Sequence, residues 1–417
     1  MITWAHLRAS AAPWLVLPAL FYVGLYIDDV AYPEPSGYGV ESGELAAFAM
    51  AVIAPVVAGA AAWEAGRHRS LGAMRATSAR RLPQQFLRAA VPVLTLHLVL
   101  VVGAVVIASR AVGVWPGGSG WLGLAHLVVL PFGWLIIGWC LGLVLPRSVA
   151  APAIGISCWA WLSMPHATTN PWLRHLGGFI DGTSTVTDVR EPAVFAVPWL
   201  VVAGLAFAVW SLAGVRRRPG TAAVGILVAA VTFAAGRSVV IDWGYQPPTS
   251  PRSVAMACTG QAPRVCVPPE YKSYANQMRQ DALPPIGRLK AAGITAPQEL
   301  RVASTEIPLK PGVWPLYWSL PPVPGGGDRP QFIADLAESA VTGSAALGGV
   351  ADCRQPGSPA AAWAALVMGL DEQAMRQGML PADWAALQQI RSLSDQEQVA
   401  WFSKAVLSQK HCAQGMR

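Results

Sequence analysis

The sequence predicts an α-helical polytopic membrane protein of about seven transmembrane helices, followed by a mainly α, disulfide-containing extracytoplasmic C-terminal domain. Two observations lead to this fold class. About seven long apolar runs occupy the first 242 residues, and each approaches the roughly 20 residues that cross the hydrocarbon core of a bilayer. The chain is also 53% hydrophobic and only 13% charged, whereas soluble domains carry about 25% charged residues.

The apolar runs are expected to be helices, because a helix satisfies its own backbone hydrogen bonds in lipid. We place them near residues 12–29, 45–63, 89–109, 121–145, 148–164, 194–214 and 220–241. The fifth run is short and has Pro152 near its start, so a tilted or partly re-entrant helix is an alternative there. Residues 1–243 would form the transmembrane domain, 244–252 a Pro-rich linker and 253–417 the C-terminal domain.

The distribution of basic residues predicts the topology. With the N-terminus inside, eleven Lys and Arg residues would lie on inner segments and three on outer loops. The positive-inside rule therefore places the N-terminus in the cytoplasm and residues 245–417 outside a multi-pass plasma-membrane protein. The formal net charge of +7 is then explained by basic residues in short loops that determine the topology. Nucleic-acid binding is therefore not expected.

The six cysteines fall into two groups. Two lie inside apolar runs and are expected to be inert packing residues, namely Cys140 and Cys158. The other four lie in the tail, where an extracytoplasmic position favours two disulfides out of three possible connectivities. The short spacing favours Cys258–Cys266, which leaves Cys353–Cys412. Four unpaired thiols are the alternative.

The largest predicted inner loop runs over residues 64–88 and is too polar to cross a membrane. Its apolar positions would suit one or two short amphipathic helices at the inner surface, namely Leu71, Met74, Leu82, Phe86 and Leu87. One interpretation is an interfacial helix that its Arg residues hold on anionic lipid. The sharper interpretation is a docking element for a cytoplasmic partner.

This loop resembles the coupling-helix region of type-2 ABC exporter permeases. The resemblance rests on Glu64 at the inner end of the second span, on the Arg, Leu and Gly positions that follow, and on the stretch 76–83. It covers about residues 1–216, and the composition is similar to that of actinobacterial permease-like proteins. It implies a dimer with a second permease copy or a paralogue, and a cytoplasmic ATP-binding subunit that docks on Glu64, Arg67, Arg69, Leu71, Gly72 and Met74.

Such permeases usually have six spans with both termini inside, so they lack the seventh span and the extracytoplasmic C-terminal domain that are predicted for this chain. Its CVPPEY and SDQEQVAWF segments look similar to a tail domain fused to actinobacterial permease-like proteins, and this likeness implies no activity. We expect a disulfide-closed hairpin before a helix at 271–292, a short strand at 299–303, and helices at 330–348, 359–376, 381–391 and 394–410. Ser394 and Glu397 would form a capping box on the last helix.

The sequence contains no motif typical of an enzyme. It has no phosphate-binding loop of the G-x-x-x-x-G-K-[ST] type, no H-E-x-x-H and no G-x-S-x-G, so we expect no catalysis, no cofactor and no metal. His97 and His126 lie in apolar runs, where an ionisable group is a functional candidate. The favoured alternative is a neutral His that is hydrogen-bonded to a neighbouring helix.

Two functions fit these expectations. The leading hypothesis is a membrane-spanning permease subunit of an ABC-type exporter, driven by a separate ATPase subunit. The alternative is a membrane-anchored extracytoplasmic sensor or binding protein that does not transport.

Overall fold

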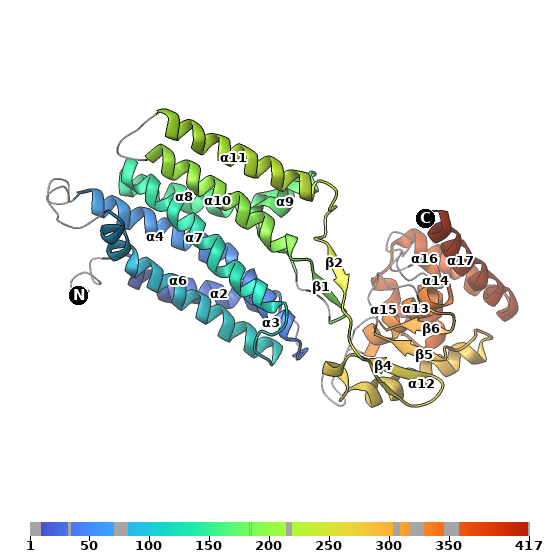
Figure 1. Ribbon diagram of the computed structural model, residues 1–417. Helices are drawn as coiled ribbons and strands as arrows, with labels where there is room; N and C mark the ends of the chain where they lie inside the picture. Colours follow the sequence, from blue (N-terminus) through green and yellow to red (C-terminus); the bar gives the residue numbers. More distant parts are fainter. Residues whose placement is uncertain are drawn as a thin grey trace. The chain divides into compact units, whose positions relative to one another are not determined.

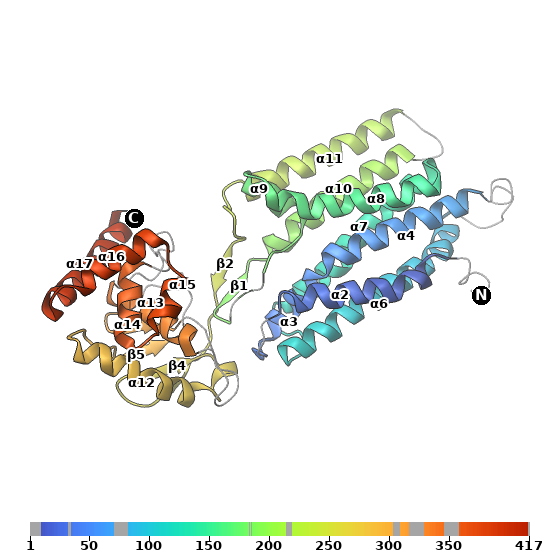
Figure 2. The ribbon, with the colours of Figure 1, turned by 180° about the vertical axis from the view of Figure 1, so that it is seen from behind.

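The computed structural model describes two compact units (Figures 1 and 2). The first contains residues 1–185 and 189–249, and the second residues 186–188 and 250–417. The residues that the structure describes are 10–31, 35–70, 82–182, 184, 186–213, 219–302, 309–316, 329–345 and 358–415, with the backbone alone at 82–86 and 409–415.

The first unit is a bundle of helices. They are α2 (Ala12–Asp28), α3 (Gly39–Phe48), α4 (Met50–Ser70), α6 (Leu82–Val112), α7 (Gly120–Val144), α8 (Arg147–Ser163), α9 (Pro171–Gly177), α10 (Ala193–Ala213) and α11 (Pro219–Val240), with a short 3-10 helix η1 (Met164–Ala167). A helix lies over each of the seven predicted apolar ranges.

Four described helices are long and apolar enough to cross a membrane, namely α6 from Leu87, α7, α10 and α11. The pair α3 and α4 adds a fifth if it counts as one span, although the two helices meet at a 45° bend. Helix α2 is apolar but has only 17 residues. The structure therefore confirms helices that could span a membrane, and within the described residues it provides four to five of them by length and composition.

The bend changes the expected start of the second span. Glu41 and Glu44 precede the second predicted span at 45–63, but both lie in α3 and are buried. The reason is a close approach to α7: a Cβ on Gly43 would overlap the backbone of Gly120, and one on Gly123 would overlap Gly43. Glycines at these positions let the two helix backbones meet, which draws the carboxylates inside.

Helices α4 and α7 pack in the same way along most of their length. Gly138 and Gly142 lie four residues apart on one face of α7, opposite Ala58 and Ala62 of α4. A Cβ on either glycine would overlap the carbonyl oxygen of the facing alanine. Such small-residue pairs allow dispersion contacts between backbones, which stabilise helix association where lipid removes the hydrophobic driving force.

The main buried core joins α2, α4, α6, α7 and α8, with contributions from α3 and α10. Helix α11 packs on α10 and α9 instead, and its Val240 belongs to a separate small cluster with Leu176, Val197 and Val201. Large apolar side chains remain exposed on the outward faces of α2 and α11, including Trp14, Leu17, Phe21, Ile226 and Leu227. Exposed apolar area of this kind is typical of contact with lipid or with another protein.

Among the described residues, the second unit combines a small sheet with six α-helices. Its strands are β3 (Ala257–Thr259), β4 (Arg264–Val267), β5 (Glu299–Arg301) and β6 (Val313–Pro315), in the order β3-β4-β5-β6. The first pair is antiparallel and the other two are parallel. The helices are α12 (Ala275–Ala291), which joins β4 to β5, and α13 (Arg329–Ala345), α14 (Pro359–Met368), α15 (Glu372–Gln377), α16 (Pro381–Arg391) and α17 (Asp395–Gly415).

Shorter elements complete the description. A 3-10 helix η2 (Pro269–Tyr271) follows β4, and β1 (Asp188–Arg190) and β2 (Thr249–Pro251) form a separate two-stranded sheet. One of the two bonds of the capping box is present, because Glu397 Oε2 accepts a hydrogen bond from Ser394 N at 2.9 Å. Ser394 Oγ donates to the same oxygen at 2.7 Å.

The disulfide predicted between Cys258 and Cys266 is confirmed, and the two residues face each other across β3 and β4. Cys140 and Cys158 are buried free thiols, as expected. Cys353 and the side chain of Cys412 lie outside the described part of the chain, so the second disulfide stays a prediction.

Breaking the confirmed disulfide should destabilise the hairpin. The two cysteines are eight residues apart. Closing a loop of this size lowers the entropy of the unfolded chain, which stabilises the folded hairpin by about 2.5 kcal/mol. We expect Cys258→Ser to raise amide hydrogen exchange at Val265 and Val267, with α7 amides unchanged as the internal control. Unchanged exchange in β4 would show that the sheet holds the hairpin without the bond.

Candidate functional site

The candidate site is built around Glu64, near the end of α4. This residue is buried, with 1% of its side chain exposed. Its Oε1 accepts hydrogen bonds from Ser10 Oγ at 2.8 Å and from Ala11 N at 3.2 Å. Its Oε2 forms an ion pair with Arg67 Nη2 at 3.0 Å. Glu64 therefore connects the end of α4 with the beginning of α2.

This contact supplies α2 with a cap from another helix. Ala11 precedes α2 and has no side-chain acceptor for the first free N–H groups of that helix. A carboxylate at a helix N-terminus also interacts favourably with the helix dipole, typically by about 0.3–1 kcal/mol. The beginning of α2 is thus held in place by a charge that belongs to α4.

Two further contacts tie the same end of α4 to its other neighbours. Arg69 Nη1 donates a hydrogen bond to Val144 O at the end of α7, where a cation interacts favourably with the helix dipole. The guanidinium of Arg147, the first residue of α8, lies 4.9 Å from the ring centre of Trp63. Within seven residues, α4 is therefore joined to α2, α7 and α8.

The structure places only part of the predicted docking set. Glu64 and Arg67 lie together, and Arg69 turns towards α7. Leu71, Gly72 and Met74 lie outside the described residues, so their role stays a prediction. The sequence interpretation missed the partner of Glu64 at the start of α2. The available signal was Ser10, a polar residue directly before the first apolar run.

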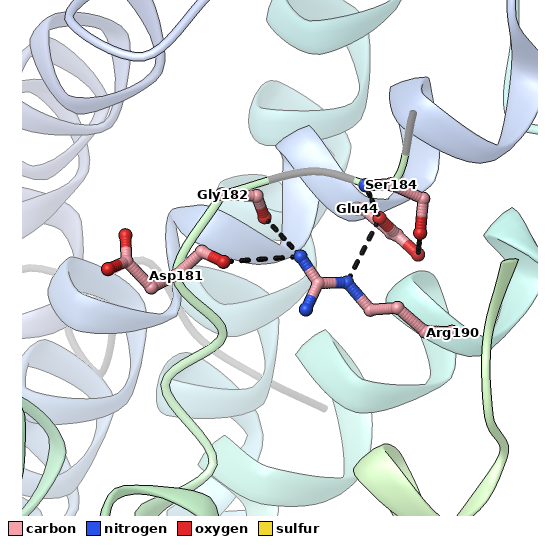
Figure 3. A network of polar contacts seen from close by, with 5 residues as sticks. All are labelled: Glu44, Asp181, Gly182, Ser184 and Arg190. Atoms are coloured by element: carbon pink, nitrogen blue, oxygen red, sulfur yellow. Dashed lines mark hydrogen bonds and ion pairs between the residues drawn. The ribbon is translucent and has the colours of Figure 1, made fainter. Parts of the chain in front are cut away.

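A second polar network lies at the opposite end of the bundle, where α3 meets the segment before α10 (Figure 3). Glu44 and Arg190 form an ion pair whose Nε–Oε2 distance is 3.2 Å, with 5% and 2% of the Arg190 and Glu44 side chains exposed. Ser184 donates to the same carboxylate from its N and from its Oγ, the latter at 2.8 Å. Arg190 Nη2 donates to the carbonyl oxygens of Gly182 at 2.7 Å and Asp181 at 3.2 Å.

This network fixes a loop to a helix. Each charge is compensated: the carboxylate accepts three hydrogen bonds and the guanidinium donates to the carboxylate and to two carbonyls. Such compensation is required because removing two charges from water costs several kcal/mol per ion. No partner was expected for Glu44 or Arg190, which both lie outside the predicted apolar runs. A carboxylate directly before an apolar run was the signal that a buried partner exists.

The histidines in the apolar helices follow the favoured alternative. His97 Nε2 donates to Leu127 O at 2.8 Å. His126 Nε2 donates to Gly178 O at 2.6 Å, and its Nδ1 accepts from Trp199 Nε1 at 2.8 Å. Because Nδ1 accepts, the His126 imidazole is the neutral Nε2–H tautomer. Both rings therefore join neighbouring segments of the bundle.

Within the described residues, no group of three or more His, Cys, Asp or Glu side chains is arranged to hold a metal ion. The role of the two networks is mechanical, because both hold segments of the chain in place. One fixes the end of α4 to three helices, and the other fixes a loop to the buried helix α3.

Part of the chain matches a known domain family. Residues 265–412 match a domain of unknown function (DUF7224), which covers most of the second unit. No curated protein and no solved structure matches the chain.

Proposed function

We propose that this chain is the membrane-spanning permease subunit of an ABC-type exporter, powered by a separate cytoplasmic ATPase subunit. The N-terminus and residues 64–88 would lie in the cytoplasm, and residues 245–417 outside. The single observation that supports the proposal is the junction at Glu64. A loop that a partner pushes needs a rigid connection to the helices it moves, and residues 63–69 at the end of α4, where this loop begins, contact α2, α7 and α8.

The proposed mechanism follows from these contacts. An ATPase subunit binds residues 64–88 through Arg67, Arg69, Leu71, Gly72 and Met74 and moves the loop during nucleotide-driven closure, while the buried Glu64 transmits the movement. Because Glu64 holds the start of α2, and Arg69 the end of α7, the movement passes to both helices together. The Glu44–Arg190 network keeps the opposite end of the bundle closed until α2 and α7 move.

Affinity purification in mild detergent tests the docking claim. We expect the wild-type chain to copurify with a protein that contains a phosphate-binding loop, and the complex to hydrolyse ATP. Replacing Leu71 and Met74 by Ala should abolish this capture with membrane insertion intact, because docking depends on specific apolar contacts. The matched control is Arg80→Lys with Arg81→Lys, which keeps the charge that lipid anchoring needs.

Two results would contradict the proposal. One is that no protein with a phosphate-binding loop copurifies with the chain from the cells that naturally produce it. The other is that the Leu71 and Met74 double variant retains the subunit as well as the Lys control does.

The second candidate is a membrane-anchored extracytoplasmic sensor or binding protein that does not transport. The observation that favours it is the extent of the family match, which is confined to the second unit and marks that unit as a recurring module. This candidate requires that the second unit binds a ligand. It also requires that the protein from the affinity purification does not hydrolyse ATP.

A further inference from the structure

Helix α11 contains one charged side chain, Arg237, which lies three residues before the last residue of the helix. The preceding residues of the helix, 219–236, carry no charge. At 1.5 Å per residue this uncharged stretch is about 27 Å long, close to the thickness of about 30 Å of the hydrocarbon core of a bilayer. With α11 across a membrane, Arg237 therefore lies at the boundary where the phosphates of the lipids are.

An aromatic platform holds the Arg237 side chain. Its guanidinium lies over the ring of Trp172 on α9, 5.1 Å from the ring centre, and α9 lies beside the C-terminal end of α11 (Figures 1 and 2). Trp172 in turn contacts the ring of Phe233 on α11 edge to face, with 6.3 Å between the ring centres. Two helices thus fix the platform, and a cation over an aromatic face is attracted by the ring.

The stacked guanidinium keeps its N–H groups available. Among the described residues, no atom accepts a hydrogen bond from Arg237 and no carboxylate pairs with it. The arginine on α9 differs in this respect, because Arg174 donates to Tyr245 O at 3.1 Å and to His166 O at 2.9 Å. Arg237, unlike Arg174, can therefore bind an anion from outside the chain.

An apolar stripe runs along α11 to Arg237. Ile226, Ala230, Ala234 and Arg237 follow one another at intervals of four, four and three residues, so they share one face of the helix. All four are exposed. The two alanines keep the stripe shallow, which leaves room for a lipid acyl chain along the helix. A cation at the membrane boundary and an apolar track below it together match the two parts of a phospholipid.

We propose that Arg237 and Trp172 bind the phosphate of an anionic phospholipid, whose acyl chain lies along Ile226, Ala230 and Ala234. The phosphate oxygens would accept hydrogen bonds from the guanidinium, whose planar fork suits bidentate binding of phosphate. A zwitterionic headgroup brings its own cation to the same place, where Arg237 repels it. The site therefore prefers a lipid with a net negative charge.

A second copy of the chain would suit this face less well. Two copies related by twofold symmetry present the same patch to each other, so their Arg237 side chains would meet at the same depth. Like charges repel, and the repulsion is stronger in surroundings of low dielectric constant. The inference goes beyond the proposed transport function, because it requires only that α11 lies in a bilayer and holds for a transporter and an anchored sensor alike.

Native mass spectrometry of the purified full-length chain in detergent, titrated with phosphatidylglycerol, tests the inference. We expect the wild-type chain to bind phosphatidylglycerol more tightly than phosphatidylcholine. Arg237→Gln should weaken phosphatidylglycerol binding about fivefold and remove this preference. Arg110→Gln is the matched control and should bind as the wild type does, because Arg110 is also an exposed arginine in the last turn of an apolar helix, α6.

Two further variants test the platform. Trp172→Leu removes the ring under the guanidinium, and Arg237→Lys keeps the charge but loses the planar fork, so both should bind phosphatidylglycerol more weakly than the wild type. If Arg237→Gln does not fold, these two variants decide, and binding equal to the wild type by both would overturn the inference.

Three other results would also overturn it. The first is that Arg237→Gln binds phosphatidylglycerol as tightly as Arg110→Gln does. The second is that the wild-type chain binds phosphatidylcholine as tightly as phosphatidylglycerol. The third is that the same spectra show a wild-type dimer which Arg237→Gln separates into monomers, because this would assign the face to a second copy of the chain.

Discussion

Replacing Gly142 by Leu should prevent the helical bundle from folding. The first added carbon overlaps the carbonyl oxygen of Ala62, and it also comes within 2.9 Å of Ala62 C and Cα. Backbone atoms cannot avoid the overlap by changing rotamer, as a side chain can, so α4 and α7 must separate along their shared face. The cost should be about 3 kcal/mol or more, which a fluorescence-detected size-exclusion assay of solubilised protein would register as loss of the monodisperse peak.

The chain offers a matched control for this change. Gly24 lies in the apolar helix α2, and a Cβ there meets nothing within 4 Å. Gly24→Leu therefore makes the same substitution in open space and should keep the peak, whereas Gly138→Leu should behave like Gly142→Leu. If Gly24→Leu and Gly142→Leu gave the same folded yield, close packing of α4 on α7 would not be what holds the bundle together.

Replacing Arg190 by Met should be the most destabilising change at the other end of the bundle. It leaves the Glu44 carboxylate, which is 2% exposed, without its countercharge. Breaking one side of a buried ion pair typically costs about 3–5 kcal/mol. The midpoint of thermal unfolding in detergent should fall accordingly, and limited proteolysis should cleave the chain between residues 181 and 190.

The double variant Glu44→Gln with Arg190→Met tests the cause. The amide oxygen of a glutamine can accept the Ser184 N–H, and its NH2 can donate to Ser184 Oγ, because a hydroxyl also accepts. No buried charge remains, so most of the lost stability should return. Arg110→Met is the control for loss of an arginine, because Arg110 is exposed at the end of α6. The charge argument is wrong if the double variant is no more stable than Arg190→Met alone.

The features that could be predicted from the sequence are local ones. Apolar runs of about 20 residues correspond to helices because lipid or protein burial demands paired backbone groups. The Cys258–Cys266 bond follows from a spacing that suits a hairpin, and the Ser394–Glu397 capping box from a four-residue pattern. Each of these depends on residues that are close together in the chain.

The features that could not be predicted depend on distant residues. Glu44 meets Arg190 across 146 positions and Glu64 meets Ser10 across 54, and no local pattern specifies either pair. The short strand predicted at 299–303 is confirmed as β5, but β6 has only three residues, too few for an alternating pattern to distinguish it from a loop. The parallel pairing of β4 with β5 depends on α12, which carries the chain from the end of β4 back to the start of β5.

The separation of α11 from the main core has a consequence for synthesis on the ribosome. Among the described residues, the main buried cluster ends with Ala206 of α10, so its helices have all been translated before α11 emerges. Chains generally fold in the order of translation, and the bundle can therefore close while the second unit is still absent. Helix α11 then packs on a surface that α9 and α10 have already formed. Assembly of the bundle is therefore a separate step from the later addition of α11 and the second unit.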